Sequence, residues 1–169
     1  MKFPSSLRAQ AGFTLVELVT VILILGVLAA VALPRYADLQ GKAREAKVKA
    51  VAGSLKAAAG LAKASAMANS VSCAAATDSS VSMEGLKVAL NHCYPAAEKA
   101  FDSGVLGAAN VSAADGWAIS ATNSGGSKPG SVLTIELNGA ATPADCSVTY
   151  TSSADADTPP VVATTVTGC

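Results

Sequence analysis

Hydrophobic residues are concentrated in one uninterrupted block near the N-terminus of the chain. Residues 1–12 are polar and basic, and residues 13–33, 21 in all, carry a single charge, that of Glu17. A helix of this length spans about 30 Å, the thickness of the hydrocarbon core of a bilayer. The pattern therefore predicts one membrane-spanning helix. A secretory signal peptide cleaved after Ala32 is the alternative, although the apolar region of such peptides is normally only about 7–15 residues long.

The segment that follows has the periodicity of an amphipathic helix. Residues 36–69 are rich in Ala, Lys, Leu and Glu, which favour helix formation. We therefore predict that the helix continues to a total of about 55 residues, roughly 80 Å, and that Pro34 breaks, kinks or loosens it. Apolar residues recur in this segment at steps of three and four positions: Val48, Val51, Ala52, Leu55, Ala59, Ala62 and Ala66.

Beyond Asn69 the pattern changes, and later segments alternate like β-strands. The residues between these segments include the turn signals of 123–126 and 138–139. A long helix followed by several short strands predicts an α+β fold, in which the helix face from Val48 to Ala66 covers a small antiparallel sheet. The predicted strands are 117–122, 131–137, 146–151 and 161–167.

The stretch between the long helix and the first of these strands has weaker signals. Residues 71–82 are rich in Ser, Ala and Thr and are predicted to form a loop. Residues 83–91 are predicted as a short helix. Pro95 suits the first turn of another helix, which would run to about residue 103.

The composition excludes several classes of protein. The 169 residues suit one domain, and the net charge of zero argues against a general nucleic-acid binder. A hydrophobic fraction of 51% argues against a disordered chain, and an aromatic fraction of 4% against an aromatic-lined ligand pocket.

The charges are distributed unevenly along the chain. Residues 35–63 hold seven basic and two acidic residues, a net +5, whereas residues 64–169 hold three Lys and nine acids, a net −6. The simplest interpretation is a solvated helix and an ordinary acidic surface. A second is that the helix of one copy meets the acidic head of another, and a third is attraction of the helix to anionic lipids.

Four cysteines follow the candidate export signal. An even number in that context predicts two disulfides, and three connectivities are possible. Metal binding is less favoured, because the chain has no CxxC motif and His92 is its only histidine. The cysteines are Cys73, Cys93, Cys146 and Cys169.

Glu17 is the one feature that neither a plain membrane helix nor a signal peptide explains. A carboxylate inside an apolar helix is costly in a membrane. Cleavage between Gly12 and Phe13 would create an ammonium group about one helical turn away, and on a neighbouring copy that group could neutralise Glu17. Such a pairing would select one axial offset between apolar helices. The alternative is a carboxylate that is protonated or reaches the interface.

These residues carry a resemblance to a known family. The motif GFTLVE at residues 12–17, after a short basic leader and before the apolar block, resembles the class III signal of type IV pilins and pseudopilins. The resemblance implies that a prepilin peptidase cuts after Gly12 and methylates Phe13, and that Glu17 takes part in assembly. Pro34 also matches the family, and Gly26 with Pro34 would mark a segment that extends when a filament forms.

Further motifs resemble the MSHA (mannose-sensitive haemagglutinin) branch of these pilins. They are CSVTYT at 146–151, VTGC at 166–169, LPRYADLQ at 33–40 and YPAA at 94–97. Many type IV pilins close their C-terminal loop with a disulfide, so the resemblance favours Cys146–Cys169 and leaves Cys73–Cys93 as the second pair.

The resemblance implies a division of the chain into a leader (1–12), an apolar transmembrane or filament-core helix (13–34), its amphipathic continuation (35–69) and a head (70–169). The expected function is that of a self-assembling structural subunit of an MSHA-like pilus used for adhesion or motility. Its expected partners are other copies, the prepilin peptidase, the inner-membrane assembly machinery and the membrane before assembly, with no nucleic acid. The alternatives are a pseudopilin of a type II secretion system and a soluble exported binding domain.

The resemblance also implies a location, which the charges dispute. The precursor would lie in the inner membrane with its head in the periplasm, and the subunit would then enter an extracellular pilus. Lys and Arg near the ends of the apolar block favour the opposite orientation, but large domains translocate largely regardless of charge.

No catalytic constellation is present in the sequence. His92 lies in no recognisable motif, and the serines lack a nucleophile elbow. Asp155 and Asp157 resemble a fragment of a calcium site, but two acids in a Ser/Pro-rich loop are more often solvated. We therefore expect no enzyme activity, no metal and no cofactor.

Overall fold

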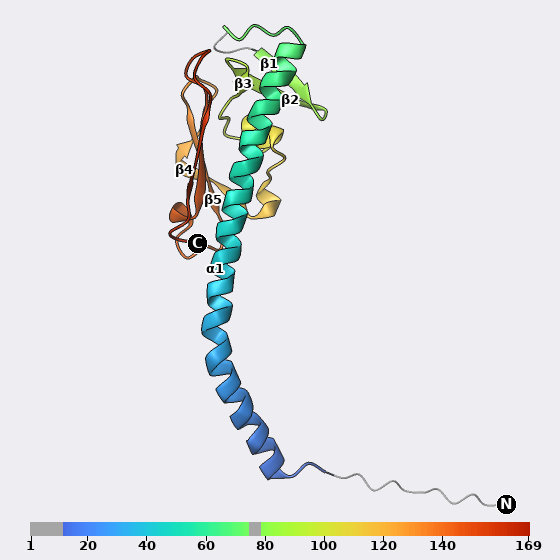
Figure 1. Cartoon of the computed structure of the whole chain (residues 1–169), viewed down its shortest axis with the longest axis vertical. Helices are drawn as coiled ribbons and strands as arrows, with labels where there is room; N and C mark the ends of the chain where they lie inside the picture. The colour runs from blue at the N-terminus through green and yellow to red at the C-terminus, as the bar shows by residue number, and fades with distance from the viewer. Residues whose placement is uncertain (1–11, 75–78) are drawn as a thin grey trace, which may run out of the picture. The chain divides into compact units, whose positions relative to one another are not determined.

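The computed structural model describes residues 12–74 and 79–169 (Figure 1). The predicted leader lies outside the described residues except for Gly12. The chain divides into two compact units, residues 1–40 and 41–169. Helix α1, Leu15–Ala68, begins in the first unit and ends in the second, which confirms that the helix continues far beyond the apolar block.

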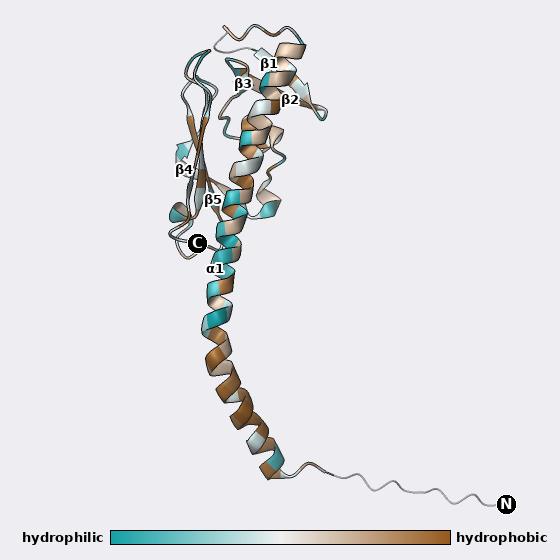
Figure 2. Ribbon diagram, in the orientation of Figure 1, coloured by the Kyte–Doolittle hydropathy of each residue, from teal (hydrophilic) through white to brown (hydrophobic). Residues whose placement is uncertain are grey.

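In the first unit, the described structure is dominated by the N-terminal part of α1. Its residues up to Leu33 are almost all hydrophobic (Figure 2). Pro34 lies inside α1, and the expected break is absent, while a kink or a looser segment there stays a prediction. Although proline lacks a hydrogen-bond donor and its ring crowds the carbonyl group one turn before it, the residues on both sides of Pro34 remain helical.

The second unit contains two small antiparallel sheets, with strand orders β1-β2-β3 and β4-β5-β6-β7. The last four strands confirm the four predicted from the alternating pattern. Short helical elements connect the strands: α2 (Gly104–Ala108), η1 (Ala113–Asp115) and η2 (Pro143–Asp145). The strands are β1 (Ser79–Met83), β2 (Leu86–Asn91), β3 (Tyr94–Pro95), β4 (Trp117–Ser124), β5 (Val132–Leu137), β6 (Ser147–Thr151) and β7 (Val161–Thr165).

Helix α1 covers both sheets of the second unit. Val48 and Leu55 pack into the larger core together with residues of β4, β5 and β6. Further along α1, Ala62 and Ala66 pack into a smaller core with residues of β1 and β2. The predicted apolar stripe is therefore the buried face. Its alanines allow the sheets to approach the helix closely, because a methyl side chain takes up little space between the helix backbone and the sheet.

Tyr150 connects the two sheets through the larger core. Its ring is buried, and its hydroxyl donates a hydrogen bond to the carbonyl oxygen of Pro95 at 2.7 Å. Burial raises the pKa of the Tyr150 phenol, and the nearby Tyr94 adds to the shift. The hydroxyl therefore keeps its proton and remains a donor, which ties β6 to β3.

The segment predicted as a helix over residues 83–91 is instead half of a hairpin. Glu84 and Gly85 both have positive φ angles, 50° and 84°, and form the two-residue turn between β1 and β2. Turns of this type suit the twist of antiparallel strands. The predicted loop 71–82 is also partly wrong, because β1 begins at Ser79. Burial of Val81 and Val88 in the smaller core favours the strands.

The helix predicted to begin at Pro95 is also absent. Tyr94 and Pro95 form β3 and pair with Asn91 and Leu90 of β2. Proline is tolerated at this position because an outer strand can lack one hydrogen-bond donor. The helix of this region is the five-residue α2, which begins only at Gly104.

Leu55→Ala should destabilise the second unit. Leu55 is 1% exposed, and its truncation leaves a cavity, so we expect a loss of roughly 2–5 kcal/mol in the free energy of unfolding. Chemical denaturation of the full chain in detergent measures it. Leu61→Ala on the same helix is the control, because Leu61 is 63% exposed. Equal losses in the two variants would contradict the assignment of the buried face.

Candidate assembly site at the start of the helix

The N-terminal part of α1 presents its apolar side chains without cover. Every residue from 12 to 40 is exposed, with Phe13 at 85% and Val27 at 69%. Among the described residues, α1 is the one helix long and apolar enough to cross a membrane, with a mean hydropathy of 2.8 in its most apolar window. Removing apolar surface from water is favourable by about 25 cal/mol of free energy per Å². This segment therefore has a strong tendency to enter a bilayer or to pack against other helices.

Glu17 closes a capping box at the first turn of α1. Its Oε2 atom accepts hydrogen bonds from the backbone N–H of Thr14 at 2.9 Å and from the Thr14 hydroxyl at 2.8 Å. In return, the backbone N–H of Glu17 donates to Thr14 Oγ1 at 3.2 Å. This exchange satisfies N–H groups that have no partner inside the helix. Within a single chain, the Glu17 carboxylate is therefore already hydrogen-bonded.

Thr14 is a site residue that the sequence prediction missed. The signal was available, because Thr14 and Glu17 have the T-x-x-E spacing of a capping box. The capping box gives the carboxylate a use in the isolated chain, in addition to the predicted pairing with the ammonium of a neighbouring copy. A pairing between copies would have to compete with two hydrogen bonds from Thr14.

The Gly12–Phe13 junction lies directly before this turn and outside the helix. Both residues are exposed, so the peptide bond between them is accessible. A Cβ atom added at Gly12 would meet nothing within 4 Å. The packing of the described residues therefore does not require glycine at position 12.

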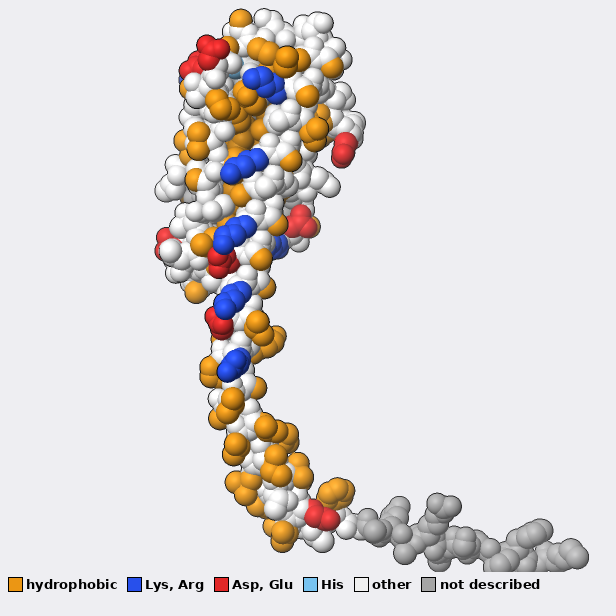
Figure 3. Space-filling view, viewed as in Figure 1, with side chains coloured by type: hydrophobic (Ala, Val, Ile, Leu, Met, Phe, Trp, Pro, Cys, Tyr) orange, Lys and Arg blue, Asp and Glu red, His pale blue; other side chains and the backbone are white. Residues whose placement is uncertain are grey.

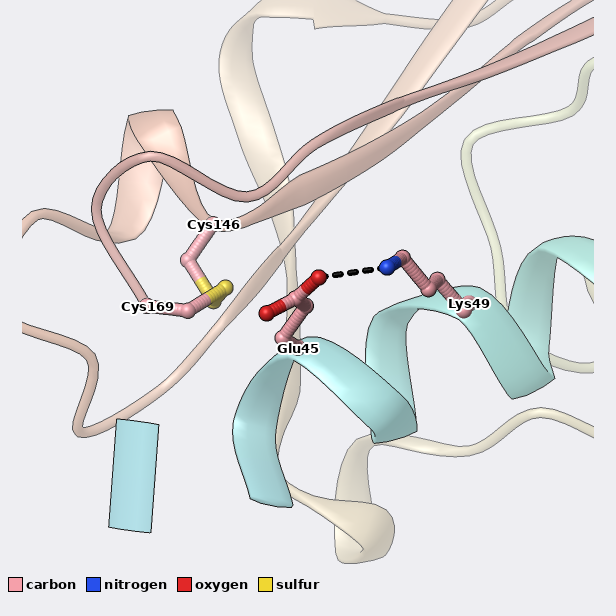
Figure 4. A network of polar contacts seen from close by, with 4 residues as sticks. All are labelled: Glu45, Lys49, Cys146 and Cys169. Carbon is pink, nitrogen blue, oxygen red and sulfur yellow. Dashed lines mark hydrogen bonds and ion pairs between the residues drawn. A yellow bond between two sulfur atoms is a disulfide. The ribbon is translucent and has the colours of Figure 1, made fainter. Parts of the chain in front are cut away.

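The end of the chain is closed onto the second unit by the Cys146–Cys169 disulfide. Figure 4 shows this disulfide facing the turns of α1 that carry Glu45 and Lys49. Arg44 on α1 donates a hydrogen bond to the carbonyl oxygen of Cys169 at 3.2 Å. The disulfide and this bond together hold residues 146–169 against α1.

The second disulfide joins Cys73 to Cys93, as expected. Cys93 and His92 have φ angles of 68° and 51°, and they form the tight turn between β2 and β3. Non-glycine residues rarely adopt this conformation. The Nδ1 atom of His92, which is 9% exposed, lies 3.1 Å from the carbonyl oxygen of Cys73. His92 therefore holds the turn together with the disulfide.

The carboxylate of Asp155, in the loop before β7, is hydrogen-bonded within that loop. The carboxylate of Asp155 accepts hydrogen bonds from the Thr158 hydroxyl, from the backbone N–H of Thr158 and from the backbone N–H of Asp157. These bonds, led by that from the Thr158 hydroxyl, lower the pKa of Asp155. Residues 12–74 and 79–169 contain no group of three or more His, Cys, Asp or Glu residues placed to hold a metal ion.

Comparisons with known proteins match the start of the chain. Residues 7–33 match the family described as the prokaryotic N-terminal methylation motif. The chain is 49% identical over 49 residues to the type IV narrow pilus major component PilA5 of Thermus thermophilus, which covers 29% of this chain and 41% of that protein. It is 52% identical over 42 residues to fimbrial protein Q of Moraxella bovis, covering 25% and 27% of the two chains.

A fimbrial protein of Pseudomonas aeruginosa is 56% identical over 32 residues, or 19% of this chain and 21% of the relative. The matches thus span only about a fifth to two fifths of these relatives. No solved structure matches the chain. The predicted resemblance is confirmed through this N-terminal similarity, and the three relatives named here are pilus and fimbrial proteins.

Removing the C-terminal disulfide should destabilise the second unit. The cysteines are 23 positions apart, and closing a loop of that size contributes about 3 kcal/mol in the chain-entropy model. We expect Cys146→Ala/Cys169→Ala to unfold at a lower temperature and to be cleaved faster by protease. The single variant Cys146→Ser should lose the same cross-link. Unchanged protease resistance in both variants would contradict this role.

Proposed function

We propose that this chain is a type IV pilin, as its N-terminal similarity to such proteins supports, and that it is a structural subunit that polymerises into a pilus. The observation that carries the proposal is an uncovered apolar helix whose first turn holds a carboxylate, directly after an accessible Gly-Phe junction. The matched methylation motif covers this junction and the apolar block.

Processing would turn the junction into half of an assembly site. Cleavage after Gly12 by a prepilin peptidase leaves Phe13 as the N-terminal residue, which the same enzyme would methylate. The Phe13 ammonium of one copy then pairs with Glu17 of its neighbour in the apolar filament core. Since a buried charge pair favours one relative position, it selects the axial offset between helices that could otherwise slide.

The bonds from Thr14 would prepare Glu17 for this step. They satisfy the carboxylate while the subunit waits in the membrane, where an unpartnered charge is costly. A neighbouring ammonium adds the attraction between two opposite charges, which the neutral donors of Thr14 do not supply. Assembly would then exchange one set of partners for a better one.

The proposed location follows from the same helix. The precursor would be anchored in the inner membrane by residues 13–34, with its head in the periplasm, until the assembly machinery transfers it into an extracellular filament. The motifs at 146–151 and 166–169 support an MSHA-type pilus that serves adhesion or motility. The role is structural and needs no cofactor.

The mass and N-terminal residue of the protein recovered from cells test the processing step. We expect the chain to begin at methylated Phe13 and to be present in filaments sheared from the cell surface, as seen by electron microscopy. A chain that begins at Leu33 would contradict the proposal and show an exported soluble domain. A chain that begins at Phe13 but never reaches surface filaments would favour a pseudopilin.

Glu17→Ala should be processed and inserted into the membrane but should assemble poorly, because the charge that fixes the offset is gone. The yield of sheared filaments, normalised to the processed subunit in the membrane, measures this. Thr14→Ala is the matched control, since it removes the capping box and keeps the carboxylate. Normal filament yield from Glu17→Ala would refute the pairing, and an equal defect in Thr14→Ala would assign the effect to helix capping.

A further inference from the structure

Five basic residues of α1 are spaced at intervals of seven positions: Arg35, Lys42, Lys49, Lys56 and Lys63. Seven residues make nearly two helical turns, so each member lies about 20° around the helix from the one before. The four lysines lie in the second unit, and we call them the basic row. Figure 3 shows Lys and Arg side chains aligned along the helix in this way.

The two remaining basic residues between positions 35 and 63, Arg44 and Lys47, make contacts within the fold of the chain. Arg44 binds the carbonyl oxygen of Cys169, and Lys47 binds that of Asp115 and lies 5.9 Å from the centre of the Trp117 ring. In the basic row, Lys63 contacts Tyr94, and Lys49 pairs with Glu45 on the same helix (Figure 4). Lys56 is exposed and has no polar partner among the described residues. Lys56 therefore faces outward with its charge available.

The surface beside Lys56 offers apolar contact as well as charge. A groove of about 260 Å³ opens there, lined by Lys56 and Gly60 of α1, Tyr94, Pro159, Pro160 and Val162. A Cβ atom added at Gly60 or Gly53 would meet nothing within 4 Å, so the backbone of α1 is open to close approach. A partner here would bury apolar surface and meet the ammonium group of Lys56 at its edge.

The second unit carries the complementary charge on its head. Residues 64–169 have a net charge of −6. In the described part of the head, six exposed acids form no ion pair with Lys or Arg, and these are Glu84, Asp102, Asp115, Asp145, Asp155 and Asp157. The head of a second copy of this chain therefore carries a net negative charge, which the basic row would attract.

We propose that the basic row is the docking surface for the acidic head of a second copy of this chain. The inference rests on the proposed function and adds a second contact to the one between apolar helices. Complementary charges fix orientation and speed up association more than they raise affinity. The contact would therefore orient the heads as subunits are added, and raised salt would slow this step.

Charge reversal in the row tests the proposal in filaments. Lys49→Glu/Lys56→Glu turns the attraction into repulsion, and we expect filament yield to fall at least about tenfold at unchanged membrane insertion. The matched control is Lys87→Glu/Lys128→Glu, which makes the same change of charge at exposed lysines of the head and should assemble normally. Retained protease resistance of the heads excludes misfolding. Normal yield from the row variant would overturn the proposal.

Acetylation of wild-type lysines provides a second measurement that needs no variant. We expect Lys49 and Lys56 to react several-fold more slowly in lipid-free filaments than in detergent-dispersed subunits, while Lys87 and Lys128 react equally in both. Lys49 and Lys56 that stay reactive in filaments but are protected in anionic vesicles would show a lipid-binding row and overturn the proposal. Absence of the wild-type chain from filaments would instead refute the proposed function itself.

Discussion

An apolar helix segment that its own chain leaves uncovered has to be buried in something else, and the rest of this structure depends on that constraint. Residues 13–33 have nearly the length of a bilayer core and are exposed throughout. A bilayer and a bundle of identical helices can each bury this apolar surface. Moving the segment from one to the other therefore changes the buried apolar area very little. Small polar differences can then decide where the segment resides. Glu17 is the only charged residue among these residues and therefore the natural place for such a difference.

The remainder of α1 serves a different purpose with the same secondary structure. Its buried face is rich in alanine and carries two sheets, each with its own core, while its flank carries lysines at heptad spacing. One face is therefore committed to the fold of the single chain, and another is exposed at Lys42, Lys49 and Lys56. A helix can combine these tasks because side chains three or four positions apart share a face and the others do not.

The elements with a strong local pattern were predictable from the sequence, and those decided by distant contacts were not. The stripe from Val48 to Ala66 and the four strands beyond Trp117 have clear periodicities, and the structure confirms both. Residues 83–91 contain good helix formers, yet the turn at Glu84 and Gly85 and the core formed with Val81 make them a strand. The hairpin depends on partners across the sheet, which a local reading of propensity does not include.

The candidate site shows the same division. Glu17 stood out because one charge in an apolar block is conspicuous, whereas Thr14 looked ordinary until the hydrogen bonds showed its role. The break expected at Pro34 is absent, because the residues on both sides of it continue α1.

The two disulfides have a mechanical consequence for the proposed pilus subunit when it is under tension. Each one staples a different core, since Cys146 belongs to the larger and Cys93 to the smaller. When force partly unfolds the head, the loops closed by these bonds, with separations of 20 and 23 positions, cannot lengthen. The segment of the head that can still unfold and lengthen lies between Cys93 and Cys146, and it includes β4 and β5. A pulled filament of such subunits would therefore extend by a limited amount per subunit before it resisted again.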